Sequence, residues 1–208
     1  MSITASAAST AIELTFLEEV LGTSPNDKDI YSNFIASKAP DATSVEDEIE
    51  AVGAEAVTEK GSTGFPRNED GEPIIWDYQL KGFFKDACGA LRRVPGTLSS
   101  KVKAYKKIID GVVFIHERQS VFRVPESGEI GICERPLRAE TPQGARVALA
   151  RSETVPAGTK LRFTLILLDK QYWPLVQEWL DYGKLRGIGQ WRNSGKGRFE
   201  WSDGSEPE

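Results

Sequence analysis

The sequence predicts an α+β fold, because segments with helical periodicity alternate along the chain with segments typical of strands. Between residues 77 and 93, apolar side chains recur at steps of three and four, which indicates a helix with one buried face. Residues 161–168, LRFTLILL, form the most apolar run and predict a central strand. Proline and glycine punctuate the strand-like segments, as expected of turns. Helices and strands are therefore expected to contribute to one core.

The elements follow in order along the chain. Strands are expected at residues 11–17, 112–115, 119–124, 146–151, 161–168 and 198–201. Helices are expected at residues 77–93, 99–109 and 173–185, the last with Pro174 in its first turn. Residues 22–70 predict an acidic insertion with short helices at 30–39 and after Ser44, because their apolar content is too low for a separate core. We therefore expect residues 1–208 to form a single domain with a loose tail, residues 202–208.

Composition narrows the class of protein. The 208 residues are 39% hydrophobic and 27% charged, which is ordinary for a folded soluble chain. No run approaches the roughly 18 apolar residues that cross a bilayer, and the N-terminus lacks the pattern of a signal peptide. Cys88 and Cys133 lie far apart without metal-ligand spacing. These features predict a cytoplasmic protein with no membrane partner, no metal and no cofactor.

Charge is distributed unevenly. The net charge is −5, yet residues 1–70 hold 14 acids and 4 bases, a net charge of −10. The remaining residues hold 22 bases and 17 acids, a net charge of +5. Because local charge governs a binding groove, the second part is compatible with a polyanionic ligand.

The stretch from residue 184 to residue 198 carries four glycines and five cations without an acid. Glycine allows close backbone approach and positive φ, cations suit phosphate and base edges, and Trp191 offers a stacking face. This chemistry predicts contact with single-stranded nucleic acid, although a hairpin with merely solvated charges is the other interpretation. The segment fits neither a phosphate-binding Walker loop nor a dinucleotide fingerprint. Its candidate RNA-binding residues are Lys184, Arg186, Gly187, Gly189, Trp191, Arg192, Ser194, Gly195, Lys196, Gly197 and Arg198.

Further cations lie on the expected helices and on a surface segment. The additional candidate RNA-binding residues are Lys81, Lys85, Arg92, Arg93, Lys103, Lys106, Arg135 and Arg138. Lys101, Lys103, Lys106 and Lys107 form either a phosphate-tracking face or a solvated helix surface.

Aromatic and acidic residues leave further alternatives. Trp76, Tyr78, Phe83 and Phe84 either stack on bases or belong to the core, and Trp173 and Trp179 are expected in the core. Glu153 is expected to order the turn that follows it.

The order of motifs resembles that of the repeat-associated mysterious protein superfamily, the RNA-binding subunits of CRISPR effector complexes. Residues 153–159, ETVPAGT, precede an apolar strand, as the family's E-x-x-x-x-G-T does. Residues 192–197, RNSGKG, match its late R-S-x-G-x-G loop with one inserted residue. Residues 76–85, WDYQLKGFFK, resemble its S-x-K-G helix start, with residues 77–79 departing from the usual sequence. Residues 133–138, CERPLR, stand where the family often has a basic strand.

The resemblance covers roughly residues 70–201 and implies a ferredoxin-like antiparallel sheet with helices on one face. It implies a non-catalytic protein similar to the CRISPR backbone subunit that lines a guide RNA, with RNA lying across the sheet and the glycine-rich loop. Single-stranded RNA, copies of itself and other CRISPR effector subunits are the implied partners. The whole chain also resembles uncharacterised bacteriophage and prophage proteins, which points to a mobile-element copy with a role against host defence.

Two other functions stay open. A glycine-rich loop can cup a small phosphorylated signal, which would make the protein an anti-defence protein that sequesters a nucleotide or blocks a host complex. Processing endonucleases of the superfamily use a histidine, and this chain has one, His116, which is otherwise a structural or exposed residue at a strand end. No early aspartate lies in a motif that matches the family's RNA-cleaving subunits, so no catalytic residue is assigned.

Overall fold

The computed structural model describes residues 7–25, 62–141 and 144–204, with the backbone alone described between residues 137 and 148. The chain divides into two compact units. The sheet–helix unit comprises Met1–Val20, Pro66–Glu129 and Val155–Glu208, and the hairpin unit comprises Leu21–Phe65 and Ile130–Thr154. The expected helices at 30–39 and after Ser44 lie outside the described residues, as does most of the expected insertion.

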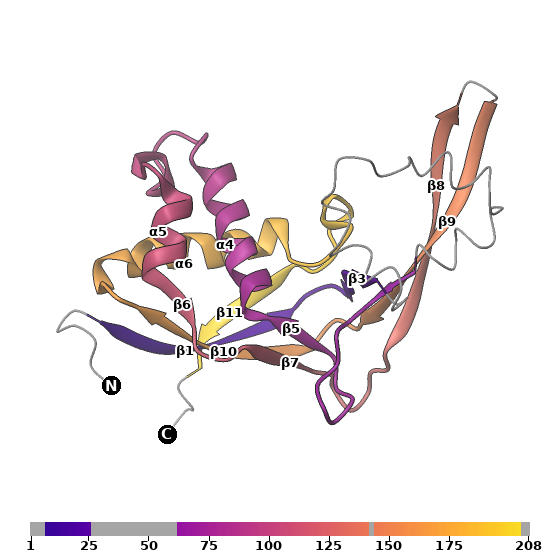
Figure 1. Cartoon of the computed structure of the whole chain (residues 1–208), viewed down its shortest axis with the longest axis horizontal. Coiled ribbons are helices and arrows are strands. Elements are labelled where there is room, and N and C mark those ends of the chain that lie inside the picture. Colours follow the sequence, from indigo (N-terminus) through magenta and orange to yellow (C-terminus); the bar gives the residue numbers. More distant parts are fainter. Residues whose placement is uncertain (1–6, 26–61, 142–143, 205–208) are drawn as a thin grey trace, which may run out of the picture. The chain divides into compact units, whose positions relative to one another are not determined.

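The sheet–helix unit contains a six-stranded sheet and three α-helices in its described part (Figure 1). The strands are β1 (Ala8–Phe16), β5 (Ile74–Trp76), β6 (Val113–Ile115), β7 (Gln119–Arg123), β10 (Lys160–Leu167) and β11 (Phe199–Asp203). The helices are α4 (Asp77–Leu91), α5 (Tyr105–Val112) and α6 (Trp173–Arg186), with 3-10 turns η1 (Ser99–Lys101), η2 (Lys170–Tyr172) and η3 (Arg192–Ser194).

The strand order is β11-β1-β10-β7-β5, with β6 also paired to β10. Strand β1 is antiparallel to both β10 and β11, and β10 is antiparallel to β6 and β7. Strands β1 and β7 lie on either side of β10, and the chain between them passes through α4. In the same way, β10 and β11 lie on either side of β1, and the chain between them passes through α6. Two interlocked, split strand–helix–strand units of this kind define the ferredoxin-like arrangement, which confirms the expected antiparallel sheet.

Alternation along the two central strands explains why one face of the sheet is covered. Leu161, Phe163 and Leu165 of β10 are buried, whereas Lys160 and Arg162, which alternate with them, are exposed. Helices α4, α5 and α6 cover the apolar face (Figure 1). Because successive side chains of a strand point to opposite faces, the apolar residues share one face of the sheet, and the helices pack on that face.

Aromatic rings fill the space between the helices and the sheet. Phe83 contacts Phe199 of β11 with ring centroids 5.3 Å apart, and Phe84 contacts the fully buried Trp179 at 5.8 Å. Phe83 and Phe84 are therefore core residues and cannot stack on bases. Trp173 is only half-buried and packs edge-on against Trp201 at 6.0 Å.

The hairpin unit consists mainly of a long two-stranded hairpin. Strands β8 (Gly131–Thr141) and β9 (Gly144–Val155) pair antiparallel along their lengths. The short strands β2 (Val20–Leu21), β3 (Ser24–Pro25) and β4 (Thr63–Gly64) complete the five-stranded sheet in the order β2-β9-β4-β3. In β8, Pro136 pairs opposite Leu149; proline is tolerated there because β8 pairs only with β9 in the described sheet and is an edge strand.

Some element boundaries differ from those expected. The basic helix expected at residues 99–109 is two elements, η1 and α5, separated at Ala104, whose φ of +51° lies in the left-handed region. Strand β11 extends to Asp203, so the sheet includes the first residues of the expected tail, and residues 205–208 lie outside the described residues. Among the described residues no helix is long and apolar enough to span a membrane.

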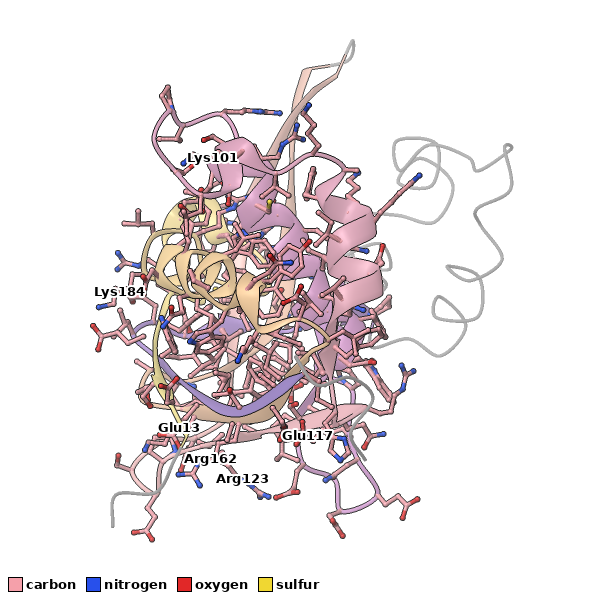
Figure 2. All side chains as sticks on the ribbon, turned by 90° about the vertical axis from the view of Figure 1, so that its left-hand side faces the viewer. Glu13, Lys101, Glu117, Arg123, Arg162 and Lys184 are labelled. Atoms are coloured by element: carbon pink, nitrogen blue, oxygen red, sulfur yellow. The ribbon has the colours of Figure 1, made fainter. Side chains whose placement is uncertain are left out.

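The helix-free face of the sheet carries a compact ion-pair cluster instead of aromatic rings at its central strands. The largely buried Glu13 of β1 accepts hydrogen bonds from Lys160 (2.7 Å) and from Arg162, both on β10 (Figure 2). Hydrogen bonds from these two cations lower the pKa of Glu13 against the opposing effect of its burial.

Glu13→Gln should therefore change both stability and its dependence on pH. The folded-state pKa lies below the ordinary value of 4.5, so the ionised form stabilises the fold above that pH and its contribution is lost as the pH falls through the lowered pKa. We expect the variant to lose about 1–2 kcal/mol of unfolding free energy at pH 7, since both cations stay half-exposed. Its acid unfolding should also be shallower below pH 4.5. Denaturant titrations from pH 3 to pH 7 measure both quantities.

The control is Glu200→Gln, which removes an exposed ion pair. In this variant the loss of unfolding free energy should stay below about 1 kcal/mol. Equal losses in the two variants would contradict the role of burial.

Candidate nucleic-acid interface

The glycine-rich loop, residues 187–197, closes on its own backbone. Ile188 N donates to the carbonyl oxygen of Gly197 (3.0 Å), and Gly197 N donates to that of Glu19 (2.9 Å). A β-carbon at Gly197 would lie 1.9 Å from the Ile188 oxygen, and one at Gly187 would lie 2.5 Å from the Gly197 carbonyl carbon. Glycine at positions 187 and 197 is thus required by contact within the chain, whereas the sequence suggested close approach of a ligand.

Each of the five cations of this stretch has an acidic partner within the sheet–helix unit. The ion pairs are Lys184–Glu200 (3.1 Å), Arg186–Asp86 (3.0 Å), Arg192–Asp86 (2.8 Å), Lys196–Glu19 (2.5 Å) and Arg198–Glu18 (2.7 Å). Glu18 and Glu19 follow β1 and Asp86 lies on α4, at least 100 positions from their partners, whereas Glu200 lies on β11 just after the loop. The loop therefore presents far less positive charge than its own sequence indicates.

Trp191 is the exposed aromatic residue of the loop. Its side chain is 42% exposed and its φ of +53° lies in the left-handed region. That conformation costs a non-glycine residue about 1–2 kcal/mol. The exposed face can stack on a base, as the sequence predicted.

Lys81 and Lys85 of α4 are both engaged by Asp110 of α5. Lys85 Nζ lies 2.6 Å from the Asp110 carboxylate, and Lys81 Nζ donates to the Asp110 carbonyl oxygen at 3.3 Å. Lys81 also lies over the ring of Phe114, 4.6 Å from its centroid, and burial lowers its pKa. These two predicted RNA-binding residues connect α4 with α5 and the following strand.

A cationic segment, residues 92–107, differs from the loop in having no acidic partners among the described residues. Residues 87–109 contain no Asp or Glu. The six exposed cations are Arg92, Arg93, Lys101, Lys103, Lys106 and Lys107, and none forms an ion pair with another described residue. Helix α4 packs against both η1 and α5, which brings the predicted Arg92, Arg93, Lys103 and Lys106 onto one connection. Arg92 lies over the ring of Tyr105, 5.0 Å from its centroid.

Glu178 of α6 anchors this segment. Its carboxylate accepts from Leu98 N (2.6 Å), Ser99 N (2.9 Å) and Ser99 Oγ (2.6 Å). The fully buried Ser99 hydroxyl also accepts from Trp179 Nε1 at 3.0 Å. No sequence signal connects residues about 80 positions apart, and this anchor was not predicted.

A stacked aromatic pair lies at the start of α4. The rings of Trp76 and Tyr78 are 6.4 Å apart and nearly parallel, at 11°, and Tyr78 is 57% exposed. Of the four aromatic residues considered for stacking, these two keep accessible ring surface.

The predicted residues of the hairpin unit are Arg135 and Arg138. Arg135 is half-buried in β8, and the side chain of Arg138 lies outside the described residues. Glu153 accepts from Phe65 N at 2.9 Å, so it joins β9 to the segment after β4.

His116 is exposed at the end of β6. The neighbouring Glu117 carboxylate accepts from Thr164 N and Thr164 Oγ1, both at 2.6 Å, and is thereby committed to the sheet. Burial raises the pKa of Glu117, but the bonds from Thr164 outweigh this effect and leave the pKa lowered. A carboxylate held ionised and bonded to Thr164 is poorly suited to act as a proton donor beside His116. Within residues 7–25, 62–136 and 149–204, no three His, Cys, Asp or Glu gather as metal ligands.

The arrangement of the chain is similar to that of proteins in CRISPR complexes. It superposes on a chain of the type III-B Cmr-beta complex bound to cognate target RNA with a TM-score of 0.56 and 11% identity, covering 95% of this chain and 60% of that one. A chain of a type IV-B CRISPR complex matches with a TM-score of 0.49 and 12% identity, covering 97% and 92% respectively. This chain thus spans less than two thirds of the Cmr-beta protein, and at this identity the likeness concerns the fold. No protein-family model and no curated sequence matches the chain.

Two glycines of the loop offer a matched test of its closure. Gly195 and Gly197 both have positive φ, +83° and +70°, but a β-carbon at Gly195 would meet nothing closer than 3.6 Å. We expect Gly195→Ala to cost about 1 kcal/mol for the left-handed backbone and Gly197→Ala about 3 kcal/mol, because overlap with Ile188 is added. Urea unfolding measures the difference, and equal costs would show that the loop does not close as described.

Removing the anchor at Glu178 should loosen η1 locally. Glu178→Ala leaves Leu98 N and the buried Ser99 without their acceptor, so we expect a loss of about 2 kcal/mol. Hydrogen exchange should accelerate at the amides of residues 98 and 99 while the amides in the middle of α6 stay protected. In the control Gln177→Ala, on the preceding residue of α6, exchange at residues 98 and 99 should match that of the wild type. Unchanged exchange in Glu178→Ala would contradict the anchoring role.

Proposed function

We propose that the protein is a non-catalytic RNA-binding subunit of a CRISPR-type effector assembly, acting as a backbone subunit along single-stranded guide RNA. The observation that carries the proposal is the ferredoxin-like arrangement, which is similar over 95% of the chain to a protein from an assembly bound to target RNA. Other CRISPR subunits and further copies of this chain are the partners that such a role requires.

The chemistry of the sheet–helix unit independently supports RNA as the ligand. Six exposed cations without acidic partners among the described residues lie between the end of α4 and the first turn of α5. Exposed aromatic rings of Tyr78 and Trp191 add surfaces on which bases can stack. Positive charge combined with aromatic faces is the usual basis of sequence-tolerant binding to single strands.

The absence of catalysis is part of the proposal. RNA cleavage without a metal needs a general base and a general acid close to the reacting hydroxyl and leaving group. His116 is the chain's sole histidine, and the Glu117 carboxylate beside it is bonded to Thr164. This arrangement favours a role in holding RNA over one in cutting it.

The purified protein should bind single-stranded RNA with an affinity that rises with length. We expect fluorescence anisotropy with RNAs of 10, 20 and 40 nucleotides to show tighter binding at each step, because a strand binder gains contacts along the chain. The log–log salt slope should be near −4, about −0.7 for each of the six segment cations. A mononucleotide should not compete at comparable concentration.

The alternatives make opposite predictions in the same experiment. Equal affinity for a mononucleotide and a long strand would indicate a nucleotide pocket, and the absence of RNA binding would refute the proposal. RNA recovered on a denaturing gel should be intact; cleavage that disappears in His116→Ala would show a histidine-dependent endoribonuclease.

A further inference from the structure

We propose that the cationic segment, residues 92–107, and not the glycine-rich loop, is the principal surface that holds the RNA sugar–phosphate backbone. The inference rests on the proposed function, since it takes single-stranded RNA as the ligand. It assigns the binding site to the connection between α4 and α5. Sequence motifs alone did not favour this connection over the loop.

The first argument is the state of the cations before RNA binds. The five cations of residues 184–198 are paired with four acids, so a phosphate must displace Asp86, Glu18, Glu19 or Glu200 from its partner. The displaced carboxylate then stays beside the phosphate and repels it. The six segment cations have no ion pair within the described part of the chain, so each can contribute fully through release of its counterions.

The second argument is preorganisation. Three hydrogen bonds from Leu98 and Ser99 to Glu178 fix η1, and packing of α4 against η1 and α5 fixes the remainder. The left-handed residue Ala104 sets the direction in which the chain leaves η1 and enters α5. Cations on a fixed backbone lose less conformational freedom on binding than cations on a mobile tail.

The third argument is that the segment is electrostatically unfavourable in the free protein. Lys106 and Lys107 occupy the first turn of α5, which contains no acid, and Lys103 precedes it. Cations at a helix N-terminus oppose the helix dipole and repel one another. A bound phosphate would relieve both effects.

The same features favour RNA over a membrane surface. A basic helix that binds a bilayer exposes an apolar face, but Ile109, the fully buried residue of α5, points into the protein core. Val94 and Leu98 are exposed singly, at 48% and 42%, which suits contact with a sugar or base. RNA held here would lie away from the helix-free face of the sheet, because Figure 2 places Lys101 on the opposite side of the unit from Glu13, Arg123 and Arg162.

Two charge-matched variants test the assignment. The segment variant carries Lys101→Gln, Lys103→Gln, Lys106→Gln and Lys107→Gln, and the loop variant carries Lys184→Gln, Arg192→Gln, Lys196→Gln and Arg198→Gln. Both remove four positive charges, so a difference between them reports on local contact and not on net charge. Circular dichroism and thermal unfolding check the fold of each.

RNA affinity is measured with a 40-nucleotide single strand at several salt concentrations. We expect the segment variant to bind about 100-fold more weakly at 0.15 M salt, with a salt slope shallower by about 3, as four lost phosphate contacts require. The loop variant should lose less than about 10-fold. Photo-crosslinking of the unmodified protein, which depends on no variant, should label a peptide containing Tyr105 more strongly than one containing Trp191.

Any other outcome contradicts either the assignment or the proposed function. If the wild type binds RNA and the loop variant loses as much affinity as the segment variant, or neither variant loses it, the assignment fails while RNA binding stands. Preferential crosslinking at Trp191 would likewise overturn the assignment. If the unmodified protein binds no RNA, the proposed function fails and the assignment fails with it.

Discussion

The pairing of β1 with β10 is the constraint on which the rest of the structure depends. Eight consecutive residue pairs join two strands that lie about 150 positions apart in sequence. This register places Ile12, Leu14 and Phe16 beside the apolar residues of β10 and turns Glu13 to the opposite face with Arg162. A slip of one residue would expose the apolar set and bury the ion-pair cluster, so the alternation protects the register. Strand β11 adds to the free edge of β1, and β6 and β7 add to that of β10, which leaves one face for all three described helices.

The same sheet brings together the charges that decide how the surface interacts with a polyanion. Glu18 and Glu19 follow β1, Asp86 lies on α4, and Glu200 lies on β11, yet all reach cations in or beside the glycine-rich loop. Exposed pairs of this kind contribute little to stability, typically less than 1 kcal/mol each, but they remove positive charge from the surface. Within the described part of the chain, the connection between α4 and α5 has no such acidic partners, so it keeps its positive charge.

These observations show which features a sequence can reveal. Helices α4 and α6 and strand β10 were predicted nearly to their ends, because their patterns reflect local periodicity and burial. Strand β8 was expected only from the family resemblance, since Pro136 and the surrounding charges conceal its alternation. The break within the expected basic helix was missed because it occurs at an alanine, Ala104, and not at a glycine or proline. The pairing of Arg186 and Arg192 with Asp86, and of Ser99 with Glu178, depends on contacts between residues 79 to 106 positions apart. No window of sequence contains them, so the loop looked more cationic than it is.

A net charge of −5 is compatible with RNA binding for the same reason. At physiological ionic strength a charge acts over about 8 Å, so a phosphate responds to the side chains beside it and hardly to the total. Under the proposed function, acids paired with cations beside the glycine-rich loop make that surface less attractive to RNA than the segment. Selectivity for one path across a protein requires repulsion elsewhere as well as attraction along the path. On this view the acids around the loop help to direct the strand, and the paired loop and the unpaired segment are two parts of one electrostatic arrangement.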